Sequence, residues 1–215
     1  MKIIGINGSP RKKGNTAALL EKALEGASSM GADTEMVHLY DLSFKGCTSC
    51  FACKLRNGTD YGKCAMKDDL TPVLEKIGKC HALVLGSPVF FGDVTGEMRS
   101  FMERLFFPNL AYSRNYRSIF PGKLKTAFIY TMNVKEEAMK ERGYDKWTGK
   151  NESLMKWFFG HCESLFSFNT LQFDDYSLYV SEMFDPEEKM EQHQKVFPLD
   201  LEASLELGKR LAGND

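Results

Sequence analysis

The stretch MKIIGINGSPRKKGNT, residues 1–16, decides the fold. It opens with an apolar run, Lys2–Ile6, whose weak alternation is typical of a strand buried on both faces. Asn7-Gly8 ends this run, and the polar loop that follows leads into an expected helix over Thr16–Met30. A buried strand, a loop of small residues and an amphipathic helix are the first unit of an α/β fold.

The alternation of strand and helix continues along the chain. Strands are expected at Glu35–Tyr40, Ala82–Leu85, Lys125–Thr131 and Leu171–Val180. Helices are expected to start at Asp68-Asp69 and to span Gly96–Phe106, Asn151–Phe166 and Leu199–Leu211, with long polar connections at Asn109–Gly122 and Val134–Lys150. This order predicts a doubly wound five-stranded parallel sheet with helices on both faces. Neither a repeat nor a linker divides residues 1–215, so we expect a single domain.

The composition excludes several classes of function. Hydrophobic residues make up 43% and charged residues 27% of the chain, which suits a large core, and the net charge is −1. Without a basic excess, neither nucleic acid nor an anionic membrane surface is an expected partner. The first residues are too quickly polar for a signal peptide, and no run reaches the ~18 apolar residues of a membrane span. We therefore expect a cytoplasmic protein whose six cysteines stay reduced.

The loop GSPRKKGNT, residues 8–16, has the features of an anion site. It joins a strand to a helix amino terminus, where free N–H groups and the helix dipole favour negative charge. Ser9, Asn15 and Thr16 add short polar side chains, and Arg11 adds positive charge. The competing interpretation is an ordinary helix cap with solvated basic residues.

Two common nucleotide motifs do not fit this loop. The dinucleotide fingerprint G-x-G-x-x-G is absent. The ATPase pattern G-x-x-x-x-G-K-[ST] fails because Gly8 and Gly14 are one residue too far apart, and because Asn15 stands where lysine is required.

Two motifs resemble one known family. Residues 8–16 resemble the FMN-phosphate loop of the NAD(P)H-dependent FMN reductase and iron–sulfur flavoprotein group, and LGSPVFFGDVTG, residues 85–96, resembles its isoalloxazine loop. The likeness continues through Met98, Phe101 and Arg104 and covers roughly residues 1–135. It implies a flavodoxin-like fold with FMN beyond the carboxyl ends of the strands, where the loops after strands one, three and four meet.

The resemblance also implies a set of site residues. The phosphate ligands would be Ser9, Arg11, Gly14, Asn15 and Thr16. The ring contacts would come from Pro88, Val89, Phe90, Phe91 and Gly92 and from Thr131, Met132 and Asn133, where other members carry a Gly-rich segment. No catalytic acid or base is expected, because the flavin itself carries the hydride chemistry.

Four cysteines form a second motif. Cys47, Cys50 and Cys53 have C-x2-C-x2-C spacing, and Cys64 follows after ten intervening residues. The run resembles the motif with which iron–sulfur flavoproteins hold a [4Fe–4S] cluster, although the insert Lys54–Lys63 is longer than in that group. The alternatives are a zinc site, a thiol–disulfide pair, or free cysteines in a loop that shapes the flavin pocket.

The leading functional hypothesis is an FMN-dependent oxidoreductase. NAD(P)H would reduce the flavin, and the electrons would pass to a quinone, another small acceptor or a redox protein. The alternatives are a non-enzymatic electron-transfer flavoprotein, disfavoured by the near-neutral charge, and a nucleotide-binding regulatory domain. The resemblance implies a homodimer or homotetramer, to which the aromatic segment Phe106–Phe120 contributes unless it folds over its own core.

Overall fold

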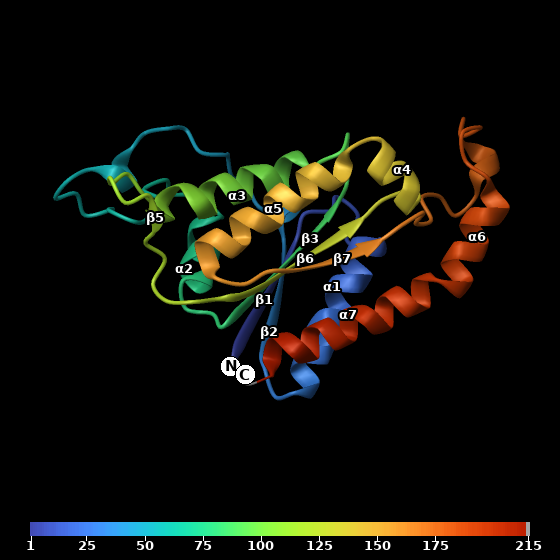
Figure 1. Cartoon of the computed structure of the whole chain (residues 1–215), viewed down its shortest axis with the longest axis horizontal. Coiled ribbons are helices and arrows are strands. Elements are labelled where there is room, and N and C mark those ends of the chain that lie inside the picture. The colour runs from blue at the N-terminus through green and yellow to red at the C-terminus, as the bar shows by residue number, and fades with distance from the viewer. Residues whose placement is uncertain (214–215) are drawn as a thin grey trace.

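Five parallel strands form one sheet in the order β2-β1-β3-β6-β7 in the computed structural model, which describes residues 1–213 (Figure 1). They are β1 (Lys2–Asn7), β2 (Asp33–His38), β3 (Ala82–Pro88), β6 (Lys125–Thr131) and β7 (Glu163–Ser167). Two short strands, β4 (Leu110–Ala111) and β5 (Arg117–Ser118), pair in antiparallel fashion outside this sheet. Strand order reverses between β1 and β3, which is where open α/β sheets bind ligands. The predicted fold class is confirmed.

Helices cover both faces of this sheet (Figure 1). One face carries α2 (Thr71–Ile77), α3 (Gly96–Asn109) and α5 (Tyr144–Phe159), and the other carries α1 (Asn15–Ser29) and α7 (Phe197–Ala212). Beyond the carboxyl ends of β6 and β7 lie α4 (Glu136–Glu141) and α6 (Pro186–Lys195). Short 3-10 helices span Leu39–Asp41, Ala52–Lys54 and Tyr176–Leu178.

The two cores follow from the alternation of side chains along each strand. On β1, Ile4 and Ile6 enter the core shared with α3 and α5, whereas Ile3 enters the core shared with α1 and α7. All three isoleucines are fully buried. A strand buried on both faces has to be apolar at nearly every position, which explains the weak alternation of Lys2–Ile6.

Helices α1 and α7 touch backbone to backbone. A Cβ atom built on Gly26 would lie 2.0 Å from the carbonyl oxygen of Leu205, and one on Gly208 would lie 1.8 Å from that of Ala23. Neither position has room for a side chain, so these glycines set the close packing of the two helices.

The predicted helix over Asn151–Phe166 is wrong at both ends. Helix α5 begins earlier, at Tyr144, and ends at Phe159, because Gly160 adopts a left-handed φ of 95° that closes the helix. The apolar residues that follow form β7, which pairs in parallel with β6. Apolar residues occur on both sides of this boundary, and Phe166 of β7 packs in the same core as Phe158 and Phe159 of α5.

The predicted strand at Leu171–Val180 is also wrong, because β7 takes its place beside β6. Residues 171–180 are irregular apart from the 3-10 helix Tyr176–Leu178. Their aromatic rings pack on one another instead of on a sheet: the centroids of Phe173 and Tyr179 lie 4.0 Å apart. Helix α6 follows, a helix that no pattern predicted, with Asp185 as its N-cap.

Other boundaries differ less. The predicted strand Lys125–Thr131 coincides with β6. The predicted connection Val134–Lys150 contains α4 and the first turns of α5, and Asn109–Gly122 contains the β4–β5 hairpin. Asp68-Asp69 precede α2 rather than start it. None of the helices in residues 1–213 is long and apolar enough to cross a membrane.

Candidate functional site

Three loops meet at the carboxyl edge of the sheet, as expected from the order of β1, β3 and β6. The amide of Gly8 donates to the carbonyl of Gly86 at 2.8 Å, which joins the first loop to β3. The buried hydroxyl of Thr95 donates to the Gly8 carbonyl at 2.7 Å and also caps α3. The amide of Val89 donates to the Thr131 carbonyl at 2.8 Å, which joins the loops after β3 and β6.

The first loop, residues 8–16, ends in a helix without a side-chain cap. Gly14 is the N-cap of α1 in an extended conformation, and no side chain accepts from the first turn. The interpretation of this loop as an ordinary Ser/Thr cap is therefore wrong. An uncapped helix start beside Arg11 suits a doubly charged phosphate, because N–H donors, helix dipole and guanidinium all favour negative charge.

The polar side chains of this loop have several partners. Ser9 is buried, and its hydroxyl accepts from the Arg11 amide at 3.1 Å. The hydroxyls of Thr16 and Thr131, both buried, share a hydrogen bond of 2.7 Å. Arg11 and Asn15 donate to the carbonyls of Gln172 and Leu171, so residues after β7 also lie beside this loop.

The second loop, residues 88–95, makes a tight turn toward solvent. Phe90 and Asp93 exchange backbone hydrogen bonds of 2.8 and 3.2 Å. Phe91 has a φ of 53° and a fully exposed side chain, and Gly92 has a φ of 90°. A Cβ on Gly92 would lie 2.8 Å from the Tyr144 ring, so both the left-handed conformation and the packing require glycine here.

Asp93 anchors this turn to two helices. Its carboxylate accepts from the Asn151 amide at 3.0 Å and pairs with Arg99. Burial favours the neutral carboxyl, but the hydrogen bonds from Asn151 and from the Val94 amide, with the Arg99 charge, outweigh it and lower the pKa of Asp93. The turn is thus held by an ionised carboxylate at neutral pH.

The third loop, residues 131–134, is held from beneath by α6. The ammonium of Lys189, whose side chain is 2% exposed, donates to the carbonyl of Asn133. Burial lowers the pKa of Lys189 to about 8. Thr170 donates through its amide, at 3.0 Å, and its hydroxyl, at 3.2 Å, to the Met132 carbonyl. A cation therefore lies under the loop that the resemblance places beside the flavin.

The four cysteines of the C-x2-C-x2-C motif line one pocket at the other end of α3. Cys47, Cys50, Cys53 and Cys64 share it with Glu103, Arg104, Phe107 and Pro108. Arg104 is eight residues along α3 from Gly96, which corresponds to about 12 Å from the second loop. The cysteine pocket and the second loop therefore lie at different positions along α3. Within residues 1–213, no three His, Cys, Asp or Glu side chains are arranged to hold a metal ion.

Two cations, one buried and one partly buried, fix this cysteine loop, residues 46–64. Arg104, whose side chain is completely buried, donates to the Cys64 sulfur at 2.9 Å and to both oxygens of Asp68 at 2.7 and 3.1 Å. Lys54 donates to the carbonyls of Phe107, Pro108 and Leu110 at the end of α3. Burial raises the pKa of the Cys53 thiol.

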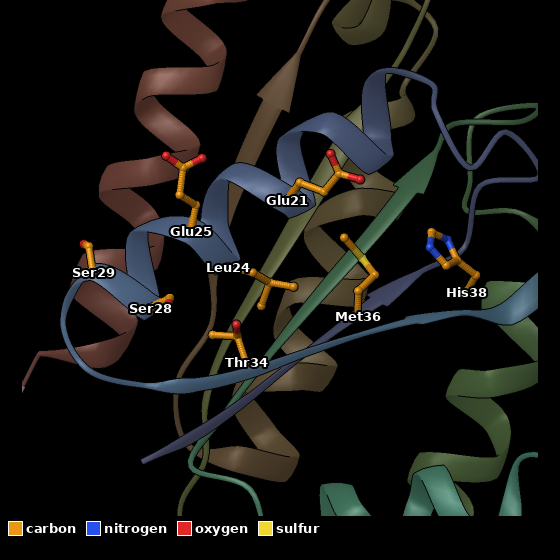
Figure 2. Close-up of a pocket in the computed structure, with 8 residues that line it drawn as sticks. All are labelled: Glu21, Leu24, Glu25, Ser28, Ser29, Thr34, Met36 and His38. Atoms are coloured by element: carbon orange, nitrogen blue, oxygen red, sulfur yellow. The ribbon is translucent and has the colours of Figure 1, made fainter.

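A groove lies away from these loops, between α1 and the edge strand β2 (Figure 2). It is lined by Glu21, Leu24, Glu25, Ser28, Ser29, Thr34, Met36 and His38. Of these, His38 lies at the end of β2, and its Nδ1 is 2.9 Å from the side-chain nitrogen Nδ2 of Asn7. The groove contains none of the residues expected to contact FMN, and we assign it no role.

Several supporting residues were not found from the sequence. Asp93 could have been found, because it is an acidic residue inside the second motif, residues 85–96. Asn151, Lys189 and the segment Leu171–Gln172 gave none, because their position depends on how α5, α6 and the chain after β7 fold back.

The fold is flavodoxin-like: the strand order reverses between β1 and β3, and the three loops meet at the carboxyl ends of these strands and of β6. A model of the NADPH-dependent FMN reductase family matches residues 1–135. This chain belongs to that family, and the predicted resemblance is confirmed.

The chain is similar in sequence to proteins named as iron–sulfur flavoproteins and to one named as an FMN-containing oxidoreductase. An iron–sulfur flavoprotein of Methanocaldococcus jannaschii is 39% identical over 104 residues, 48% of this chain and 51% of that protein. An iron–sulfur flavoprotein of Archaeoglobus fulgidus is 40% identical over 117 residues, 54% of this chain and 53% of that protein. The chain thus spans about half the length of these relatives. A putative NAD(P)H-dependent FMN-containing oxidoreductase of Bacillus subtilis is 28% identical over 83% of this chain and 84% of that protein.

Solved structures share the fold. An NAD(P)H:quinone oxidoreductase from Methanothermobacter marburgensis has a TM-score of 0.71 at 17% identity, covering 100% of this chain and 98% of that one. An azoreductase from Bacillus anthracis has a TM-score of 0.68 at 13% identity, covering 98% and 99%. At such identities the likeness concerns the fold alone.

Proposed function

We propose that this protein is an FMN-dependent oxidoreductase that takes a hydride from NAD(P)H and passes electrons to a small acceptor or a redox protein. The observation that carries the proposal is the uncapped start of α1 at the β1/β3 reversal, joined through Gly8 and Thr95 to the exposed turn after β3. One end of this site suits a phosphate, and a flat ring would lie at the other. Membership of the NADPH-dependent FMN reductase family supports the same activity.

The phosphate would be held by the first loop. The backbone amides of Asn15 and Thr16 open α1, Gly14 closes the preceding turn, and Ser9 and Arg11 flank it. Arg11 has five N–H donors in a planar fork, so it can bind a phosphate oxygen while it keeps its bond to the Gln172 carbonyl.

The flavin ring would lie between the second and third loops. Pro88, Val89, Phe90, Phe91 and Gly92 would flank one side, and Thr131, Met132 and Asn133 the other. FMN supplies the hydride chemistry when bound. The protein's residues bind and orient it, and we assign none of them as a catalytic acid or base.

The test is an absorption spectrum and an NADPH oxidation assay on protein saturated with FMN. We expect a two-band flavin spectrum and NADPH-dependent bleaching under anaerobic conditions. Arg11→Ala should weaken FMN binding at least tenfold, whereas Lys12→Ala, which removes an exposed ion pair with Asp41, should change it less than twofold. A protein that takes up no FMN contradicts the proposal.

A second candidate is an electron-transfer flavoprotein with a [4Fe–4S] cluster on Cys47, Cys50, Cys53 and Cys64. The observation that favours it is the common pocket of the four thiols. Such a cluster would exchange single electrons with a protein partner. Iron and acid-labile sulfide, assayed on protein purified without oxygen, decide the matter: about four of each per chain supports the cluster, and none removes it.

We also propose that the chain folds as one FMN-binding domain and assembles as a homodimer or homotetramer. The first part is supported by the shared sheet and the cores on its two faces. The second is supported by Tyr112 and Tyr116, which are 61% and 68% exposed in the segment Phe106–Phe120. Light scattering of the purified protein measures the assembly, and a monomer at micromolar concentration contradicts it.

A further inference from the structure

A buried cation lies under the third loop without a carboxylate beside it to form an ion pair within residues 1–213. Lys189 is 2% exposed. Its ammonium donates to the Asn133 carbonyl and lies 4.9 Å from the centre of the Phe184 ring. Burial of a charge without an opposite charge is costly, and buried charges in proteins are therefore usually paired. The Lys189 ammonium thus has positive charge to offer to an anion at this loop.

Two charged neighbours of Lys189 offset each other. Glu188, the preceding residue in α6, pairs with Lys135 at 2.6 Å, and its Oε1 also accepts from the Asn169 side-chain amide at 3.0 Å. Glu188 raises the pKa of Lys189 and Lys135 lowers it, while burial brings this pKa to about 8. Lys189 is therefore mostly protonated at pH 7, and the neighbouring ion pair does not cancel its charge.

The carbonyl that Lys189 holds belongs to the carboxyl edge of the sheet. Helix α6 lies beyond the ends of β6 and β7 (Figure 1). The Val89 amide joins the second loop to the third at the Thr131 carbonyl, and the Asn133 carbonyl comes two residues later. Lys189 lies outside residues 1–135, which match the family model, so family membership assigns it no role.

Transfer of a hydride adds negative charge to a flavin. The oxidised ring is neutral, and the hydride that leaves NAD(P)H brings one proton and two electrons, so the ring gains one negative charge and the nicotinamide becomes NAD(P)⁺. We propose that Lys189 is a positioning residue that acts through Asn133 and the third loop, and that its charge raises the affinity of the site for reduced FMN relative to oxidised FMN. This inference rests on the proposed function, in which the ring lies between the second and third loops. The attraction is Coulombic, and salt screens it little because Lys189 is buried.

The experiment measures the two-electron reduction potential of bound FMN at pH 7 and the affinities of the apoprotein for oxidised and for dithionite-reduced FMN. Lys189→Met removes the charge and keeps an unbranched side chain. The affinity for reduced FMN should fall about tenfold more than the affinity for oxidised FMN, which makes the potential about 30 mV more negative.

Two variants are matched controls for Lys189→Met. Lys189→Arg keeps the charge at the same position, and Lys195→Met removes an exposed lysine from the same helix. Both should keep the ratio of the two affinities within about threefold of the intact protein, since exposed charges are screened by solvent. A structural role of Lys189 would lower both affinities together and leave the potential unchanged.

Glu188→Gln tests the sign of the effect even if Lys189→Met does not fold. It removes the negative charge beside Lys189 and keeps an oxygen that can accept from Asn169, so the relative affinity for reduced FMN should rise. The inference is overturned if Lys189→Met and Lys195→Met have the same potential, or if Glu188→Gln lowers the relative affinity or leaves it unchanged. An intact protein that binds neither form of FMN overturns the proposed function as well, so the two failures are distinguishable.

Discussion

The carboxyl edge and the cysteine loop are built in different ways. At the edge, loops begin where paired strands end, and backbone bonds such as Gly8 to Gly86 and Val89 to Thr131 hold them together. The cysteine loop lies outside the five-stranded sheet and is held by two cations, the buried Arg104 and the partly buried Lys54. A site that follows from sheet topology tolerates the loss of single side chains, whereas a loop held by buried charges does not.

The largest effect is expected for Arg104→Ala. Breaking a buried ion pair by removing one partner costs about 3–5 kcal/mol, because the Asp68 carboxylate then keeps its burial without its cation. Urea unfolding measures the loss. Lys22→Ala, which removes an exposed pair with Glu25, should cost less than about 0.5 kcal/mol.

The same variant also tests whether the cysteine loop and the carboxyl edge are energetically independent. Folded Arg104→Ala protein should bind FMN within about threefold of the intact protein, because its flavin loops rest on separate backbone bonds. A tenfold loss of FMN affinity in the folded variant would mean that the cysteine loop supports the flavin site.

Lys189 is an exception at the edge, since one buried ammonium holds the third loop. Its pKa is about 8 in the folded protein, against roughly 10.4 when unfolded. Between these values the unfolded chain binds more protons, so folding stability rises with pH, by up to about 3 kcal/mol. Urea midpoints measured from pH 7.5 to 10 should show this rise.

Lys189→Met should flatten the rise, and Lys195→Met, which changes an exposed lysine on the same helix, should keep it. Equal pH profiles for the two variants contradict the assignment of this titration to Lys189.

Gly92→Ala sharpens the comparison within the second loop. A left-handed φ of 90° and a Cβ only 2.8 Å from Tyr144 should cost about 2 kcal/mol and lower FMN affinity at least tenfold. A Cβ at Gly96 would meet nothing within 4 Å. Gly96→Ala should therefore change the free energy of unfolding and the free energy of FMN binding by less than about 0.5 kcal/mol each. Thermal unfolding and flavin titration of the pair measure the difference, and identical behaviour refutes the role given to Gly92.

The smallest effect concerns Asp93. Its pKa is lowered in the folded protein, so its stabilising contribution is complete above the unfolded value of roughly 3.9 and is lost as pH falls through the folded value. The loss should be smaller than the one expected for Arg104→Ala. Stability measured from pH 6 to 3 should fall less steeply in Asp93→Asn, and a steeper fall contradicts the sign.

The sequence predicted those parts that local rules determine. Residues 2–6 were predicted to form a buried strand because they are apolar on both faces. The loop after them was predicted to be an anion site because it joins a strand to a helix. The boundary at Gly160 was missed because apolar residues occur on both sides of it, Phe158 and Phe159 in α5 and Leu165 and Phe166 in β7. The contacts of residues 171–172 with the first loop and the position of Lys189 were missed because they depend on segments that are distant in the sequence.

Hydrogen exchange of backbone amides, measured with and without FMN, tests the central claim most directly. The account predicts that FMN slows exchange in residues 8–16, 88–95 and 131–134, and leaves residues 46–64 unchanged. Slowed exchange confined to residues 46–64, or no change anywhere at saturating FMN, would contradict a flavin site at the carboxyl edge of the sheet.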